Sequence, residues 1–106
     1  MTLGAAVLFF TSGTAHLLGQ EQKDPVAFCG ELGELAEAMM TARQAGVLMS
    51  KIMAEVANHG ELAPIMQKLA VAAYDTPQFS VEKNRRDAAV RFRNDFEVEC
   101  FKGLME

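Results

Sequence analysis

The chain has 106 residues, of which 50% are hydrophobic, 23% are charged and three are proline. That length suits one small domain, and the composition excludes a disordered or low-complexity protein. The net charge of -4 at pH 7 argues against a general nucleic-acid binder, which needs surplus lysine and arginine. Alanine, leucine and glutamate are frequent and tryptophan is absent, which favours helices. We therefore expect an all-α fold, a small four-helix bundle-like domain.

Residues 1–15 have the pattern of a signal peptide. An apolar run covers residues 3–10, no charged residue precedes Glu21, and Gly13 and Ala15 suit a signal-peptidase site before His16. The run is too short to span a membrane. The basic residue that normally opens such a leader is missing, which a truncated leader or a misplaced start explains. We expect this apolar leader to lie outside the core and to be removed, leaving one helical domain at 16–106; the alternative is a buried N-terminal helix.

The two cysteines, Cys29 and Cys100, both follow the expected cleavage site. An exported protein meets an oxidising compartment, so we expect one disulfide between them, which closes a loop of about 70 residues and stabilises the fold by about 4 kcal/mol. The alternative is a pair of buried free thiols in a cytosolic protein. The disulfide and the leader together predict a periplasmic or secreted protein with no stable membrane insertion after cleavage.

Apolar periodicity and capping residues predict four helices, at 25–45, 50–58, 64–74 and from 80 to the end of the chain. Asp24 and Pro25 open the first helix and Gly46 ends it, while Ser50 and Ser80 are expected to cap the second and fourth.

The apolar stripes of the first and last helices each contain one cysteine, so we expect these helices to pack antiparallel. In that register, Leu32 and Met39 face Phe96 and Phe92. Glu34 or Glu37 then comes within reach of Arg91 or Arg93.

Three segments carry a resemblance to a known group of proteins: ARQAGV at 42–47 followed by Met49 and Ser50, AYDTPQFS at 73–80, and FRNDF at 92–96 followed by Cys100. With these segments the chain resembles a group of small exported bacterial and prophage-associated proteins of unknown function. The resemblance covers most of residues 26–104. It implies an exported helical domain with a cysteine pair and no assigned activity.

Catalytic and metal-binding patterns are weak. His16 and His59 have no nucleophile beside them in sequence, and no zinc-binding spacing is present. The acidic row Glu31, Glu34 and Glu37 is typical of a solvated helix face. Five methionines lie close together in the sequence and could attract copper (Met39, Met40, Met49, Met53 and Met66). Three of them, Met39, Met53 and Met66, have the helical spacing of core residues, which favours packing over metal binding. We expect no enzyme activity, no cofactor and no metal site.

The best candidate interaction residues are Tyr74, Phe79, Arg85 and Arg86. Tyr74 and Phe79 flank a proline-broken turn and form either a packed staple or an exposed aromatic pair for a partner. Arg85 and Arg86 have two interpretations. They form ion pairs with acidic residues of another helix, or they form a basic patch that binds an acidic partner or an anionic membrane.

We therefore expect an exported protein that acts by protein–protein interaction, with an unknown protein partner and an unknown oligomeric state. The alternatives are an immunity- or inhibitor-type protein against an envelope enzyme, a small periplasmic chaperone, or, less favoured, an enzyme or a copper binder.

Overall fold

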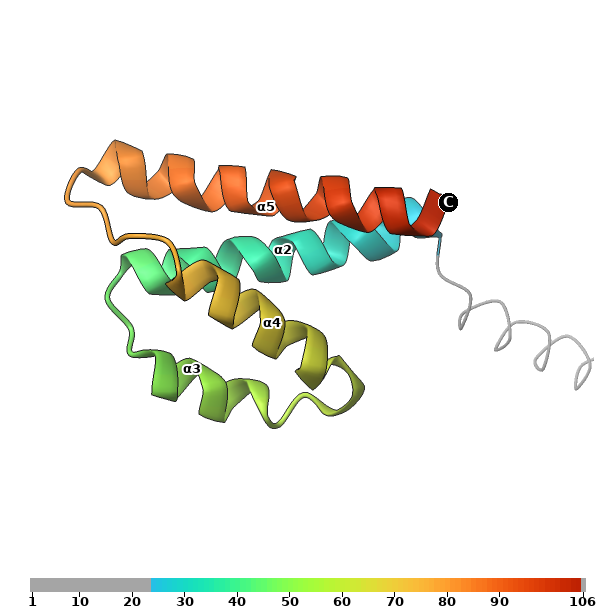
Figure 1. Cartoon of the computed structure of the whole chain (residues 1–106), viewed down its shortest axis with the longest axis horizontal. Helices are drawn as coiled ribbons and strands as arrows, with labels where there is room; N and C mark the ends of the chain where they lie inside the picture. The colour runs from blue at the N-terminus through green and yellow to red at the C-terminus, as the bar shows by residue number, and fades with distance from the viewer. Residues whose placement is uncertain (1–23, 106) are drawn as a thin grey trace, which may run out of the picture.

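The computed structural model describes residues 24–105, which form four α-helices and one short 3₁₀ turn (Figure 1). These are α2 (Pro25–Gln44), α3 (Met49–Val56), η1 (Gly60–Leu62), α4 (Ala63–Tyr74) and α5 (Glu82–Met105). The expected all-α fold with four helices is thus confirmed. The predicted signal peptide and its cleavage site lie outside the described residues.

The ends of the first helix follow the sequence signals. Asp24 is at the N-cap and Pro25 at the first helical position, although the Asp24 side chain makes no capping hydrogen bond. The helix ends at Gln44, and Gly46 adopts a positive φ of 85°, which a residue without a Cβ takes readily.

The expected serine caps are both wrong. Leu48 is at the N-cap of α3, and its carbonyl accepts the first helical bonds from Lys51 and Ile52, so Ser50 lies inside the helix. The fourth helix begins at Glu82, with Val81 supplying the first acceptor, to the Arg85 N–H. Other hydrogen bonds hold the preceding turn in a non-helical path, and these displace the start of α5 beyond Ser80.

The long helices α2 and α5 form an antiparallel pair that is the framework of the domain (Figure 1). Cys29 and Cys100 form the expected disulfide, with their Cα atoms 5.8 Å apart. One turn further along α2, Gly33 touches Glu97, and one turn beyond that Glu37 pairs with Arg93. Each step up α2 is therefore matched by a step down α5, which is the register that the cysteine stripes predict.

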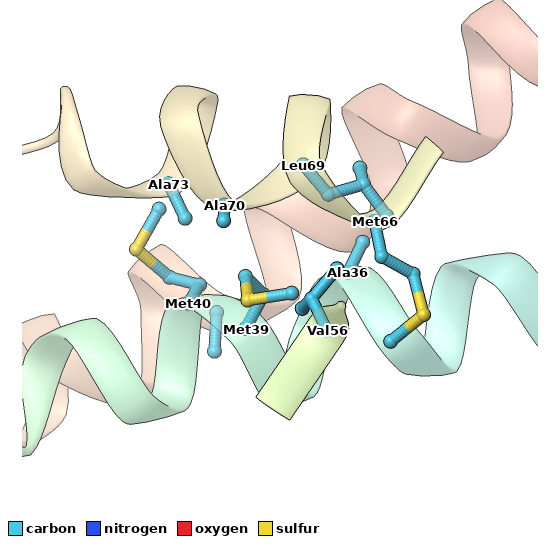
Figure 2. Packing of buried hydrophobic residues seen from close by; sticks show 9 residues of the cluster. Ala36, Met39, Met40, Val56, Met66, Leu69, Ala70 and Ala73 are labelled. Carbon is cyan, nitrogen blue, oxygen red and sulfur yellow. The ribbon is translucent and has the colours of Figure 1, made fainter. Parts of the chain in front are cut away.

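The core lies where α4 crosses α2, and its large side chains are mainly methionines. Met39 and Met40 of α2 lie against Ala70 and Ala73 of α4, and these two alanines are fully buried (Figure 2). Small side chains facing long flexible ones allow the two helices to approach closely. Phe92 packs against the same cluster as Met39, as expected.

The short helix α3 closes the core from the other side of α4. Its one buried residue, Val56, lies close to Ala36 of α2 and Met66 of α4 (Figure 2). The first half of α4 diverges from α2 in Figure 1, whereas its last turn lies close to the C-terminal end of α2. This divergence determines where the domain has an open surface.

Candidate functional site

The turn between α4 and α5 is held by the last residue of α2. Gln44 is 2% exposed; its Nε2 donates to the Pro77 carbonyl at 2.9 Å and its Oε1 accepts from the Phe79 N–H at 2.8 Å. Gln78 in turn donates to the Gln44 carbonyl at 3.2 Å. A single buried amide therefore satisfies two backbone groups of the turn, one as donor and one as acceptor.

Arg43 and Tyr74 hold the same turn from its other end. Arg43 donates to the Thr76 carbonyl at 2.9 Å, and its guanidinium lies over the Tyr74 ring at 5.3 Å from the centroid. The Tyr74 hydroxyl donates to the Val47 carbonyl at 2.5 Å. Burial raises the pKa of Tyr74 above its ordinary value, and the Arg43 cation opposes that shift.

Phe79 and Arg85 complete this structure. The Arg85 Nε donates to the Phe79 carbonyl at 2.6 Å, and the Phe79 side chain is half-buried. It lines a shallow hollow of about 250 Å³ with Met40 and Phe92. Tyr74 and Phe79 are thus both half-buried, which fits the packed-staple interpretation better than the exposed-pair interpretation.

Arg86 differs from the other three candidate interaction residues. Its side chain is 70% exposed, and it forms an ion pair with Glu82, one turn earlier, at 3.9 Å. Neighbouring Lys83 and Asp87 also pair with each other, at 2.7 Å. Acids thus alternate with bases on this exposed face. The candidate role of all four residues in partner binding stays a prediction.

Two segments that are far apart in the chain, residues 42–47 and 73–80, meet in this turn. ARQAGV supplies Arg43, Gln44 and the Val47 carbonyl, and AYDTPQFS supplies Tyr74 and the carbonyls and N–H that these side chains bind. The two segments therefore hold the α2–α3 connection against the α4–α5 turn.

A cluster of three charges joins α2 to α5. Arg93 donates to Glu37 at 2.8 Å across the helix pair and to Glu97 at 3.0 Å on its own helix. The hydrogen bonds to Glu37 and then Glu97 raise the pKa of the Arg93 guanidinium above its ordinary value. The expected pairing of Glu37 with Arg93 is confirmed, and it places a base against an acid in the half of α5 where the helix dipole alone does not favour it.

A groove lies between the diverging half of α4, the start of α2 and the end of α5, with a volume of about 500 Å³. Its lining is apolar except for Lys68 and Glu99 (Phe28, Leu32, Ile65, Leu69, Ala72, Phe96, Cys100, Gly103 and Leu104). We call these eleven residues the apolar groove. The predicted facing pair Leu32 and Phe96 lines it together.

Side chains that could support chemistry are dispersed. Within residues 24–105, no group of three or more histidine, cysteine, aspartate or glutamate residues could hold a metal ion. His59 is exposed at the start of η1, away from any nucleophile in sequence. Met39, Met40 and Met66 are buried in the core, and Met49 and Met53 are half-buried. His16 lies outside the described residues.

Among the helices of the described chain, none is long and apolar enough to cross a membrane. No protein-family model, no curated protein and no solved structure matches the chain.

Proposed function

We propose that this chain is an exported binding protein that acts by docking another protein in the apolar groove. The observation that carries the proposal is the groove itself. Its rim includes exposed large apolar side chains, with Ile65 36% and Leu104 49% exposed, and these are continuous with the buried Leu32 and Leu69. Single exposed apolar side chains are ordinary, but a contiguous concave set of them marks an interaction surface.

The exposed apolar side chains elsewhere on the long helices do not form such a set. Val26 of α2 is 62% exposed, and Val90 and Val98 of α5 are 59% and 42% exposed, but none of the three lines the groove. On α5, charged and polar residues surround Val90 and Val98. The groove is thus a surface of the described domain on which burial of apolar area by a partner would be favourable.

The proposal of export has separate support. The disulfide of Cys29 with Cys100 fits an oxidising compartment, and the apolar run at residues 3–10 fits a leader that is removed. The resemblance to exported bacterial and prophage-associated proteins points the same way. We propose the periplasm or the secreted fraction as the place where the protein works.

Site-specific photocrosslinking tests the docking surface. A photoreactive residue at Ile65 or Leu104 should give the same discrete adduct in the exporting cell, identified by mass spectrometry. The same residue at Val71, which is on α4 outside the groove and 54% exposed, is the matched control. A second position at Arg86 tests the basic patch. Adducts at Val71 or Arg86 but not at the two groove positions would contradict the proposal.

Intact-mass measurement tests export. Protein recovered from the periplasm or medium should begin near His16 and should contain no thiol that alkylates without reductant. A mass that still includes residues 1–15, or two free thiols, would contradict it.

A further inference from the structure

We infer that the occupant of the apolar groove is an amphipathic α-helix of the partner protein, which carries an acidic side chain beside its apolar stripe, opposite Lys68. This inference rests on the proposed function and specifies the chemistry of the partner.

The first argument concerns backbone hydrogen bonds. The groove residues lie within α2, α4 and α5, where backbone N–H and C=O groups are already paired inside each helix except in the first turn of α4, which contains Ile65, and in the last turn of α5. Among the described residues that line the groove, Lys68 and Glu99 alone have polar side chains. An extended peptide would bury N–H and C=O groups against walls that offer almost no partners, at a high cost in free energy. A helix pairs its own backbone groups and presents only side chains, so it fits this surface.

The second argument concerns charge. Glu99 is paired with Lys102 at 3.6 Å, whereas Lys68 of the opposite wall makes no ion pair or side-chain hydrogen bond within residues 24–105. The rim of the groove therefore has one uncompensated positive charge. A carboxylate on the docked helix complements it, and such a rim contact sets the orientation of the helix more than its affinity.

The third argument excludes a second copy of the described domain as the natural occupant. The apolar stripes of its helices face its own core. On α5, the exposed Val90 and Val98 lie outside the groove, and polar side chains occupy the positions at helical spacing between them (Arg93, Asn94 and Glu97). No described helix therefore offers a free apolar stripe to the groove of another copy.

Synthetic helices test the inference on the oxidised, exported protein. The probe is a side-chain-stapled peptide of about 18 residues, with leucines at every third and fourth position and a glutamate beside that stripe. A second peptide replaces the glutamate with lysine, and a third has a central proline that prevents the helix. Affinity is measured by fluorescence polarisation.

The first peptide should bind, and Ile65→Asn should weaken its binding by about tenfold or more because it places an amide in the apolar wall. Val71→Asn is the matched control on the same helix and should leave the affinity unchanged. Leu104→Asn replaces Ile65→Asn as the test if the latter lowers the thermal stability of the domain. Lys68→Glu should weaken the binding of the acidic peptide by about threefold to tenfold and should strengthen the binding of the lysine peptide. A merely structural effect would not change the two affinities in opposite directions.

Different outcomes overturn different statements. Equal binding of the proline peptide, or no crossover of charge preference at Lys68, would overturn the inference of an acidic helix and leave the groove as a protein-docking site. Equal effects of Ile65→Asn and Val71→Asn would overturn both the inference and the proposed function. Two further outcomes would also overturn both. One is binding of anionic phospholipid vesicles through the groove when the peptides do not bind. The other is a dimer, detected by sedimentation, that Ile65→Asn dissociates.

Discussion

The carboxylate of Glu97 on α5 occupies the space directly above Gly33 of α2. A Cβ at position 33 would collide with the Oε2, Cδ and Cγ atoms of Glu97. A glycine in the middle of a helix costs about 0.5–1 kcal/mol relative to alanine, so the close approach of Glu97 is gained at the expense of helix propensity. In this position the Glu97 Oε2 lies 3.0 Å from the Arg93 Nε, within the cluster of charges that joins the two long helices.

Replacing Gly30 and Gly33 separately should show this relationship. Gly30 is on the same helix, and a Cβ there would meet nothing within 4 Å, so Gly30→Ala should raise the free energy of unfolding by about 0.5–1 kcal/mol. Gly33→Ala should gain clearly less or lose stability, because the Glu97 side chain must leave its position. Urea unfolding measures both.

A double-mutant cycle separates the two effects at Gly33. In the Glu97→Ala background the collision is absent, and Gly33→Ala should then stabilise the domain about as much as Gly30→Ala does. An equal effect of Gly33→Ala in both backgrounds would show that Glu97 does not lie above Gly33.

The disulfide should be the largest single contribution to stability in the helix pair. For a sequence separation of 71 residues the chain-entropy model gives about 4 kcal/mol. Substitution of both cysteines by serine should therefore lower the free energy of unfolding by several kcal/mol. Glu37→Gln, which removes a partly exposed ion pair, should cost only about 0.2–1 kcal/mol. An unchanged melting temperature of the double-serine variant would contradict this ordering.

Gln44 should be sensitive to substitution even though it is not apolar. Gln44→Met keeps the side-chain length but leaves the Phe79 N–H without its acceptor and the Pro77 carbonyl without its donor, which should cost about 1–3 kcal/mol. Gln67→Met, at an exposed glutamine of α4, should change stability by less than about 0.5 kcal/mol. Equal effects at the two positions would mean that the buried amide does not hold the turn.

Tyr74 should make stability depend on pH in the alkaline range. Its folded pKa lies above the ordinary 10.0 because burial disfavours the phenolate. The contribution to stability is therefore fully present below pH 10.0 and is lost as the pH rises through the folded pKa. Tyr74→Phe should cost about 0.5–1.5 kcal/mol near neutral pH, through loss of the hydrogen bond to Val47.

The difference between the wild-type protein and Tyr74→Phe should then shrink above pH 10, because the variant has no phenol to titrate. Tyr74 is the only tyrosine of the chain, so its ionisation can be followed directly by ultraviolet absorbance. A difference in unfolding free energy that stays constant with alkaline pH would contradict the raised pKa.

Local signals and one long-range constraint account for what could be predicted. Asp24, Pro25 and Gly46 mark the ends of α2 because their backbone preferences act locally. The position of each cysteine on an apolar stripe fixed the register of α2 against α5, and the pairing of Glu37 with Arg93 followed from that register.

The wrong and missed features depend on contacts between distant segments. Ser50 and Ser80 have the residue type of a cap, but the start of α5 is set by bonds from Gln44 and Arg85 to the Phe79 backbone. Nothing in a sequence distinguishes the buried amide of Gln44 from an ordinary surface glutamine. The apolar groove was missed for a related reason, since it arises from the angle between α4 and α2 and not from the periodicity of either helix.

The bond between Cys29 and Cys100 also makes a covalent ring of almost the whole described domain. The exposed turn at Asn58 and His59, between α3 and η1, is an accessible place for a protease to cut. A chain cut there remains one molecule, because the fragment with α2 and the fragment with α5 stay joined through the disulfide and through the packing of their helices. In surroundings rich in proteases, a single break in the backbone therefore leaves the two halves and the walls of the groove tethered together.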